Sequence, residues 1–210
     1  KDEIDKIRKV LRLSSGAQIA VLPNDGSIVR CIFRNHAAEP VEVLRPESET
    51  PLHLTLAQAL PKGDKLDEIV RACTEIGVSR FVFFPSDRTV VRWDEKKTES
   101  RMQRLQAIAR ESAEVSFRVR LPEMEIAQNL EEVLRKWPEA TVLSEVEGVA
   151  SKLCRMPSPM VIVVGPEGGW SDREIKAIGS RGATLGPRVL RVDHAGPAAA
   201  AILLLQYEPR

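Results

Sequence analysis

Hydrophobic and polar positions change their spacing once along the chain. In the first part, short apolar runs at residues 18–22, 27–33 and 40–44 have the pattern of β-strands, and Pro-Asn-Asp-Gly separates the first two. An amphipathic stretch at residues 2–13 precedes them and predicts a short helix. Short strands joined by tight turns predict a small β module, a barrel or half-barrel, at residues 1–46.

A polar segment bracketed by prolines, residues 47–51, follows and predicts a linker. Beyond it, apolar runs typical of buried strands alternate with segments of helical period. This alternation predicts an α/β fold with a mostly parallel sheet and helices on both faces over residues 52–210. The expected strands are residues 52–60, 81–84, 141–144, 160–164 and 183–185, and the expected helices are residues 64–76, 94–117, 130–137, 171–181 and 193–207.

The composition is that of an ordinary globular protein, with 43% apolar and 29% charged residues. No segment approaches the roughly 20 apolar residues that a membrane-spanning helix needs. The three cysteines are far apart and lack metal-site spacing, which favours a reducing cytoplasm and no metal. A net charge of +1 argues against a purely electrostatic nucleic-acid binder, although basic residues outnumber acidic ones between residues 80 and 120.

The strongest chemical signal is the turn Gly-Pro-Glu-Gly-Gly at residues 165–169, directly after an apolar strand. Ligands of open α/β sheets bind beyond the carboxyl ends of the strands, and glycines let the backbone approach them. Ser171 and Glu174 match a capping box for the next helix, and Trp170 is expected to seat the turn. The turn is neither a dinucleotide fingerprint nor a P-loop, so the pattern alone allows a ligand site or a plain strand-to-helix connection.

A second signal is Leu-Gly-Pro-Arg-Val-Leu-Arg at residues 185–191. Gly-Pro forces a turn there, and Arg188 and Arg191 could bind a phosphate or a carboxylate. The alternative is a surface loop in which Val189 and Leu190 are buried. A weaker third signal is Thr-Val-Leu-Ser-Glu at residues 141–145, a strand that ends in polar residues.

Together these strings resemble the family of ribosomal RNA small-subunit methyltransferases that make 3-methyluridine. The pairing of Gly-Pro-Glu-Gly-Gly with Leu-Gly-Pro-Arg-Val-Leu-Arg is specific, and the resemblance covers nearly the whole chain. It is carried by residues 57–65, 74–80, 88–92, 111–114, 118–122, 165–169, 185–191 and 195–206.

The resemblance implies a PUA-like RNA-binding module at residues 1–46 and a deep trefoil-knot (SPOUT) domain at residues 52–210. It implies S-adenosylmethionine-dependent methylation of N3 of a specific uridine in 16S ribosomal RNA by a cytoplasmic homodimer. It also implies that three loops bind the cofactor. Their residues are Leu143, Ser144, Glu145, Gly165, Pro166, Glu167, Gly168, Gly169, Leu185, Gly186, Val189 and Leu190.

The chemistry sets a further requirement, because N3 of uridine carries a proton and is a poor nucleophile until that proton leaves. A base or a cation that stabilises the uridinate oxygens is needed. The candidate cations are Arg92, Arg118, Arg120 and Arg191, and the candidate bases are Glu75, Glu111 and Glu114. Among these we favour Arg191, Arg120 and Glu114. The expected RNA contacts are Arg8, Arg12, Arg30, Arg34, Arg92 and Arg118.

Three other functions stay open at this point. A knotted methyltransferase could act on another RNA, such as transfer RNA or large-subunit ribosomal RNA. A non-catalytic RNA-binding relative could keep the fold, although it would have no need of the turn at residues 165–169. A nicotinamide-dependent oxidoreductase is disfavoured, because the sequence lacks GxGxxG and the acidic residue expected about 20 positions further on.

Overall fold

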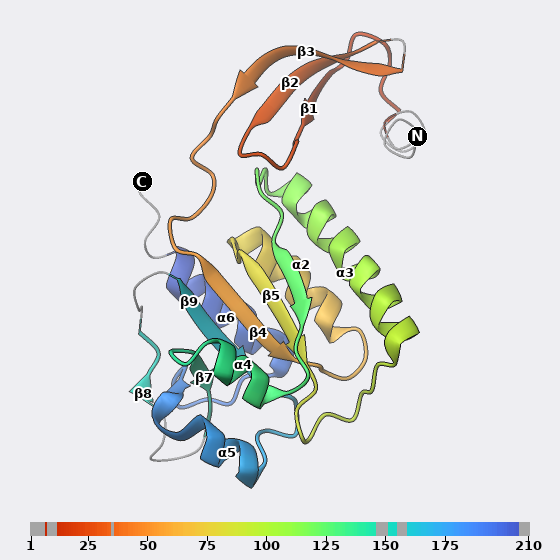
Figure 1. Cartoon of the computed structure of the whole chain (residues 1–210). Helices are drawn as coiled ribbons and strands as arrows, with labels where there is room; N and C mark the ends of the chain where they lie inside the picture. The colour runs from red at the N-terminus through yellow and green to blue at the C-terminus, as the bar shows by residue number, and fades with distance from the viewer. Residues whose placement is uncertain (1–6, 8–11, 35, 146–150, 155–158, 206–210) are drawn as a thin grey trace. The chain divides into compact units, whose positions relative to one another are not determined.

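The chain forms two compact units in the computed structural model (Figure 1). Unit 1 comprises Lys1–Glu49 and Phe117–Arg120, and unit 2 comprises Thr50–Ser116 and Leu121–Arg210. The first boundary falls inside the expected linker, but a short segment from within the second expected domain belongs to unit 1. The described residues are 7, 12–34, 36–145, 151–154 and 159–205, so most of the expected helix at residues 2–13 lies outside them.

Unit 1 contains a three-stranded antiparallel sheet in the order β1-β2-β3. Its strands are β1 (Gln18–Val21), β2 (Ile28–Arg34) and β3 (Ala37–Leu44). Cys31 and Phe33 of β2 are buried, whereas every residue of β3 is exposed. The small β module is confirmed as an antiparallel sheet, and its closure into a PUA-like barrel stays a prediction.

The segment Phe117–Arg120 is bound into unit 1 by the carboxylate of Glu49. One oxygen of this carboxylate accepts from the backbone N–H groups of Val119 (2.9 Å) and Arg120 (3.0 Å). The other accepts from the guanidinium of Arg118 at 2.7 Å. The N–H of Gly26 in turn donates to the carbonyl of Val119. We call this arrangement the Glu49 clamp. It joins segments that lie about seventy positions apart in the sequence.

Unit 2 is built on a seven-stranded sheet in the order β6-β5-β4-β9-β7-β10-β8, with every pairing parallel (Figure 1). This confirms the α/β class. Two strands had no clear signal in the sequence, because β6 alternates glutamates with apolar residues at the sheet edge and β8 has only two residues. The strands are β4 (Leu54–Ala59), β5 (Arg80–Phe84), β6 (Glu123–Ile126), β7 (Thr141–Leu143), β8 (Ser151–Lys152), β9 (Met160–Val164) and β10 (Gly182–Thr184).

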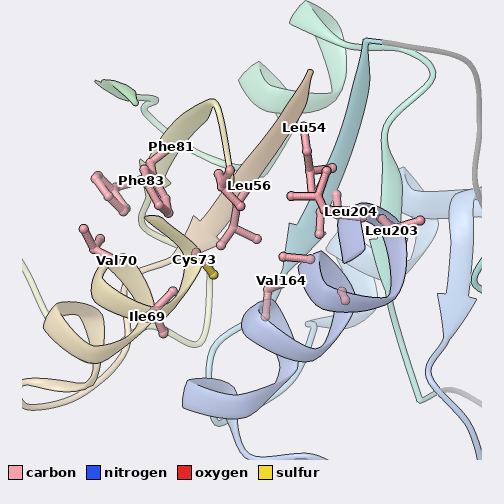
Figure 2. Close-up of a cluster of buried hydrophobic side chains, with 14 of the residues drawn as sticks. Leu54, Leu56, Ile69, Val70, Cys73, Phe81, Phe83, Val164, Leu203 and Leu204 are labelled. Atoms are coloured by element: carbon pink, nitrogen blue, oxygen red, sulfur yellow. The ribbon is translucent and has the colours of Figure 1, made fainter. Parts of the chain in front are cut away.

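Helices cover both faces of this sheet. Side chains alternate along a strand, so Leu54 and Leu56 of β4 pack on one side and Ala57 and Ala59 on the other. Figure 2 shows the first side, where leucines and phenylalanines of the sheet meet α2 and α6. Helices α2 (Lys65–Ile76), α3 (Glu95–Val115) and α6 (Val192–Leu204) cover this face, and α4 (Leu130–Lys136) and α5 (Asp172–Ile178) cover the other.

The helix ends follow the local signals in the sequence. Gly77 closes α2 in the left-handed conformation, with φ of 114°. Asp94 caps α3 by accepting from the N–H of Lys97, and Ser171 and Glu174 form the capping box of α5. Within the described part of the chain, no helix is long and apolar enough to cross a membrane.

Candidate cofactor-binding site

A cavity of about 660 Å³ lies at one edge of the sheet in unit 2. Its lining residues come from segments that follow β4, β5, β7, β9 and β10, and from the start of α6. Because these strands are parallel, their carboxyl ends meet at the same edge. The volume lies within the range of pockets that bind small molecules and cofactors.

The cavity brings the three expected cofactor loops together. Of the twelve residues named from the sequence, ten line it, and Gly168 and Gly186 are not among the lining residues. The lining includes the apolar residues Leu143, Leu185, Val189 and Leu190 together with the glycine-rich turn. Such a lining suits a ligand with a flat apolar ring and charged ends. The ten are Leu143, Ser144, Glu145, Gly165, Pro166, Glu167, Gly169, Leu185, Val189 and Leu190.

Two positions of the turn require glycine for different structural reasons. Gly169 has φ of 68°, a left-handed conformation that favours glycine, and a side chain there would meet open space. A Cβ on Gly168 would come within 3.2 Å of the Cβ of Arg88. Gly168 therefore allows the loop after β5 to pack on the turn, whereas the sequence suggested that this glycine makes room for a ligand.

Trp170 seats the turn, as expected. Its indole N–H donates to the carbonyl of Leu143 at 3.0 Å. A Cβ on Gly165 would lie 3.0 Å from the indole ring, so the ring fills the space beside that glycine. The ring is also parallel to that of Phe84, with 6.5 Å between the centroids. One side chain thus fixes the loop after β7 relative to the loop after β9.

Glu167 ties the turn to the start of α2. Its carboxylate accepts from the ammonium of Lys65 at 2.6 Å and from the backbone N–H of Lys62 at 3.0 Å. Partial burial alone would raise the pKa of Glu167, but these two donors and its own backbone N–H outweigh burial and lower it. The carboxylate is therefore ionised at neutral pH and pairs with Lys65.

The loop after β5 is bound to the start of α5 by Asp87. Its carboxylate accepts from the hydroxyl of Ser171 at 2.6 Å and from the guanidinium of Arg173. These hydrogen bonds lower the pKa of Asp87. The backbone N–H of Asp87 also donates to Glu174 at 3.0 Å, so the two segments hold each other from both sides.

Four cations among the described residues line the cavity, and they differ in their partners. Lys65 pairs with Glu167, and Arg191 donates to Asp193 at 3.2 Å. Burial raises the pKa of Asp193, but its own backbone N–H and Arg191 outweigh burial and lower it. Among the described residues, no ion pair is formed by Arg88 or Arg188. Arg88 was not among the residues expected at the site, although it lay within the matching string at residues 88–92.

Of the residues favoured for catalysis, only Arg191 lines the cavity. Arg120 belongs to unit 1, where its guanidinium donates to the backbone carbonyl of Asp25 at 3.4 Å. Glu114 is half-buried on α3 and is not a lining residue. Among the residues that the structure describes, the carboxylates that line the cavity are Glu145, Glu167 and Asp172.

The arginines expected to bind RNA occupy different environments. Arg12 and Arg92 are exposed, and Arg8 lies outside the described residues. Arg30 and Arg34 are about half exposed and pair with Glu42 and Glu39. Arg118 departs from the expectation: it is 5% exposed and bound in the Glu49 clamp, so its guanidinium has little surface to offer a phosphate.

The chain matches the RNA methyltransferase domain family over residues 48–204. It is 30% identical to ribosomal RNA small subunit methyltransferase E of Bacillus subtilis, with 99% of this chain and 89% of that protein covered. The protein of the same name from Synechocystis is 34% identical, with 95% of this chain and 69% of that protein covered. The crystal structure of a ribosomal RNA small subunit methyltransferase E from Neisseria gonorrhoeae, bound to S-adenosyl methionine, superposes with a TM-score of 0.83 at 32% identity. The superposition covers 96% of this chain and 88% of that chain.

Proposed function

Because this chain belongs to the RNA methyltransferase family, among the ribosomal RNA small subunit methyltransferases E, we propose that it methylates N3 of a uridine in 16S ribosomal RNA with S-adenosylmethionine. One observation carries the proposal. Ten of the residues named for the cofactor converge on one cavity, in a chain that aligns nearly end to end with a relative solved with S-adenosyl methionine.

S-adenosylmethionine supplies a methyl group on a positively charged sulfur, which makes that methyl carbon open to attack by a nucleophile. Residues 143–145, 165–169 and 185–190 would hold it, with Trp170 and Glu167 keeping the first two loops in place. The apolar side chains of Leu143, Leu185 and Leu190 suit its adenine ring. Held in this way, donor and acceptor react as parts of one complex, which removes much of the entropic barrier.

The remaining task of the protein is to help the N3 proton leave. Positive charge near the uracil oxygens stabilises the uridinate that forms, and a fixed donor in a site shielded from water does so most effectively. Arg191 is one such cation in the cavity, although Asp193 offsets part of its charge. A carboxylate that accepts the proton would come from the lining set, since Glu114 lies outside it.

We also propose that unit 1 and the exposed arginines bind the ribosomal RNA through its phosphates. Arg12 in unit 1 and Arg92 in unit 2 are exposed and suited to this contact. Arg12→Gln and Arg92→Gln should each reduce the salt dependence of RNA affinity by about 0.7–0.9 log units per log unit of salt for each lost contact. An unchanged slope in filter-binding titrations would assign these charges to solubility.

The knot, the homodimer and the cytoplasmic location complete the proposal. Ile202 and Leu205 at the end of α6 are 37% and 52% exposed, although the helix buries Ala199, Ala200 and Leu203 against the sheet. An apolar side that the single chain leaves uncovered supports pairing with a second copy. Light scattering should give a dimer mass at micromolar concentration, and a mass of 23.3 kDa would contradict it.

The decisive experiment for the reaction is nucleoside mass spectrometry. Purified protein is incubated with S-adenosylmethionine and small ribosomal subunits that lack the modification, and the RNA is digested to nucleosides. We expect 3-methyluridine, identified by co-elution with a standard. Methylation at C5 or at a ribose hydroxyl would disprove the N3 assignment. Methylation of transfer RNA or large-subunit RNA in place of 16S ribosomal RNA would favour the alternative substrates.

A further inference from the structure

The two sides of the cavity are formed by segments that follow different strands of the sheet. The three cofactor loops follow β9, β7 and β10, which are neighbours in the sheet order. Lys65 and Arg88 come from segments after β4 and β5, which lie on the opposite side of β9 (Figure 1). A cofactor held by the three loops therefore leaves the β4–β5 side of the cavity for the methyl acceptor.

Arg88 is held in place on the β4–β5 side. Its guanidinium donates to the carbonyl of Gly168 at 3.0 Å, and its Cβ packs where Gly168 lacks a side chain. The preceding residue, Asp87, is bound to Ser171, Arg173 and Glu174 at the start of α5. The guanidinium is thus fixed to the glycine-rich turn itself, on a loop whose backbone is also fixed.

Charge distinguishes the two cations of this side. Lys65 has a carboxylate partner at 2.6 Å in Glu167. Arg88 uses one N–H on a neutral carbonyl, and in the described part of the chain no carboxylate pairs with it. A guanidinium has five N–H donors in a planar fork, so most of them are available to an incoming group.

We propose that Arg88 binds the target uracil at a ring oxygen next to N3 and stabilises the uridinate. This inference rests on the proposed function. As the N3 proton passes to solvent or a carboxylate, the negative charge spreads to the ring oxygens, where the guanidinium donates. The lone pair of N3 then forms the bond to the methyl carbon, while the electron pair of the carbon–sulfur bond stays on sulfur and leaves a neutral thioether. The charge of Arg88 is most useful in the transition state.

The test compares three variants for methyl transfer to small ribosomal subunits, for S-adenosylmethionine affinity by calorimetry, and for the pH dependence of kcat. Arg88→Gln removes the charge but keeps a donor for the Gly168 carbonyl. We expect a loss of about 100-fold in kcat, with cofactor affinity kept within about 3-fold. The rise of rate with pH should move to higher pH, because the uracil loses the cation that favours its ionised form.

Two further variants separate charge from general damage. Arg88→Lys keeps the charge without the planar fork and should restore part of the rate and of the pH profile. Arg135→Gln removes an exposed arginine of α4 that does not line the cavity, and it should behave as the unmodified protein.

Each of the following results would contradict the proposed role of Arg88. An Arg88→Gln protein with full kcat would exclude a role for the charge. A cofactor affinity reduced more than about 10-fold would make Arg88 a cofactor-binding residue. A raised KM for RNA with unchanged kcat and pH profile would assign Arg88 to a phosphate. If the unmodified protein transfers methyl groups to RNA but yields no 3-methyluridine, the proposed function fails, independently of any variant.

Discussion

In unit 2, every residue of the interior strand β4 is buried, on both faces of the sheet, whereas in unit 1 every residue of the outer strand β3 is exposed. Apolar burial on two faces accounts for the cohesion of unit 2. Unit 1 has few buried apolar residues in its described sheet, notably Cys31 and Phe33, and depends in addition on the Glu49 clamp.

This difference separates a unit that is stabilised by a two-sided apolar core from a unit that is stabilised in part by hydrogen bonds. Close packing against the sheet fixes the strand ends of unit 2, and with them the loops around the cavity. In unit 1, a few hydrogen bonds to the carboxylate of Glu49 hold the segment Phe117–Arg120, which comes from the middle of the chain. We therefore expect damage to unit 2 to be global and damage to unit 1 to be local.

The largest effect should follow from Phe83→Ala in β5. This side chain is fully buried in the core that Figure 2 shows, so its loss should lower the free energy of unfolding by about 3–5 kcal/mol. Phe33→Ala in the sheet of unit 1 is the matched change and should cost less, because among the described residues Phe33 belongs to neither hydrophobic core cluster. Urea denaturation measures both, and equal losses would contradict the contrast between the units.

Glu49→Ala should have the next largest effect, confined to unit 1. Arg118 is 5% exposed, and removing its carboxylate leaves a buried charge with a weakened set of partners. We expect a loss of roughly 3 kcal/mol in the local stability of unit 1. Hydrogen exchange at the amides of Gly26, Val119 and Arg120 should accelerate while β4 and β9 stay protected.

The matched control for this change is Glu39→Ala. Glu39 pairs with Arg34 on the surface of the same sheet, where both side chains are about half exposed. Exposed ion pairs contribute little to stability, so exchange in unit 1 should barely change. Acceleration in β4 after Glu49→Ala would show that the clamp supports both units.

Trp170→Phe should have a smaller effect, on the cofactor loops alone. Phenylalanine keeps an aromatic ring at this position but lacks the N–H that donates to Leu143. An unpaired carbonyl at this point costs about 1–2 kcal/mol, which corresponds to roughly 10-fold weaker S-adenosylmethionine binding if the loop shifts. Calorimetric titration checks this, and unchanged affinity would show that the loop after β7 needs no anchor.

The smallest effect should be a loss of folding stability at acid pH through Glu167. The pKa of Glu167 is lowered in the folded protein, so its stabilising contribution is present above the ordinary value of 4.5. It is lost as the pH falls through the lowered value. Thermal unfolding from pH 7 to pH 3 should show a decline in the acid range that is smaller in Glu167→Gln. An identical decline in both proteins would exclude Glu167 as its source.

Much of unit 2 could be predicted because its signals are local. The capping box at Ser171 and Glu174 needs only neighbouring residues, and it is confirmed. The left-handed Gly77 that ends α2 likewise depends only on its neighbours. The three loops expected to bind the cofactor were named from the family resemblance, and they meet at one edge of the sheet because each comes directly after a parallel strand. The strand β6 was not predicted, because its alternating glutamates do not have the apolar pattern of a buried strand. It lies at the edge of the sheet, where it pairs with β5.

The sequence by itself determined the α/β class and several helix ends, since periodic burial and capping are set within a few residues, and its resemblance to a known family pointed to the three loops that line the cavity. Only the tertiary structure decided which distant residues meet. It paired Arg118 with Glu49, 69 positions away, and placed Arg88 on Gly168, 80 positions away. Such contacts depend on the path of the whole chain, and a buried arginine bound to a carboxylate has the same sequence pattern as one that would face a substrate.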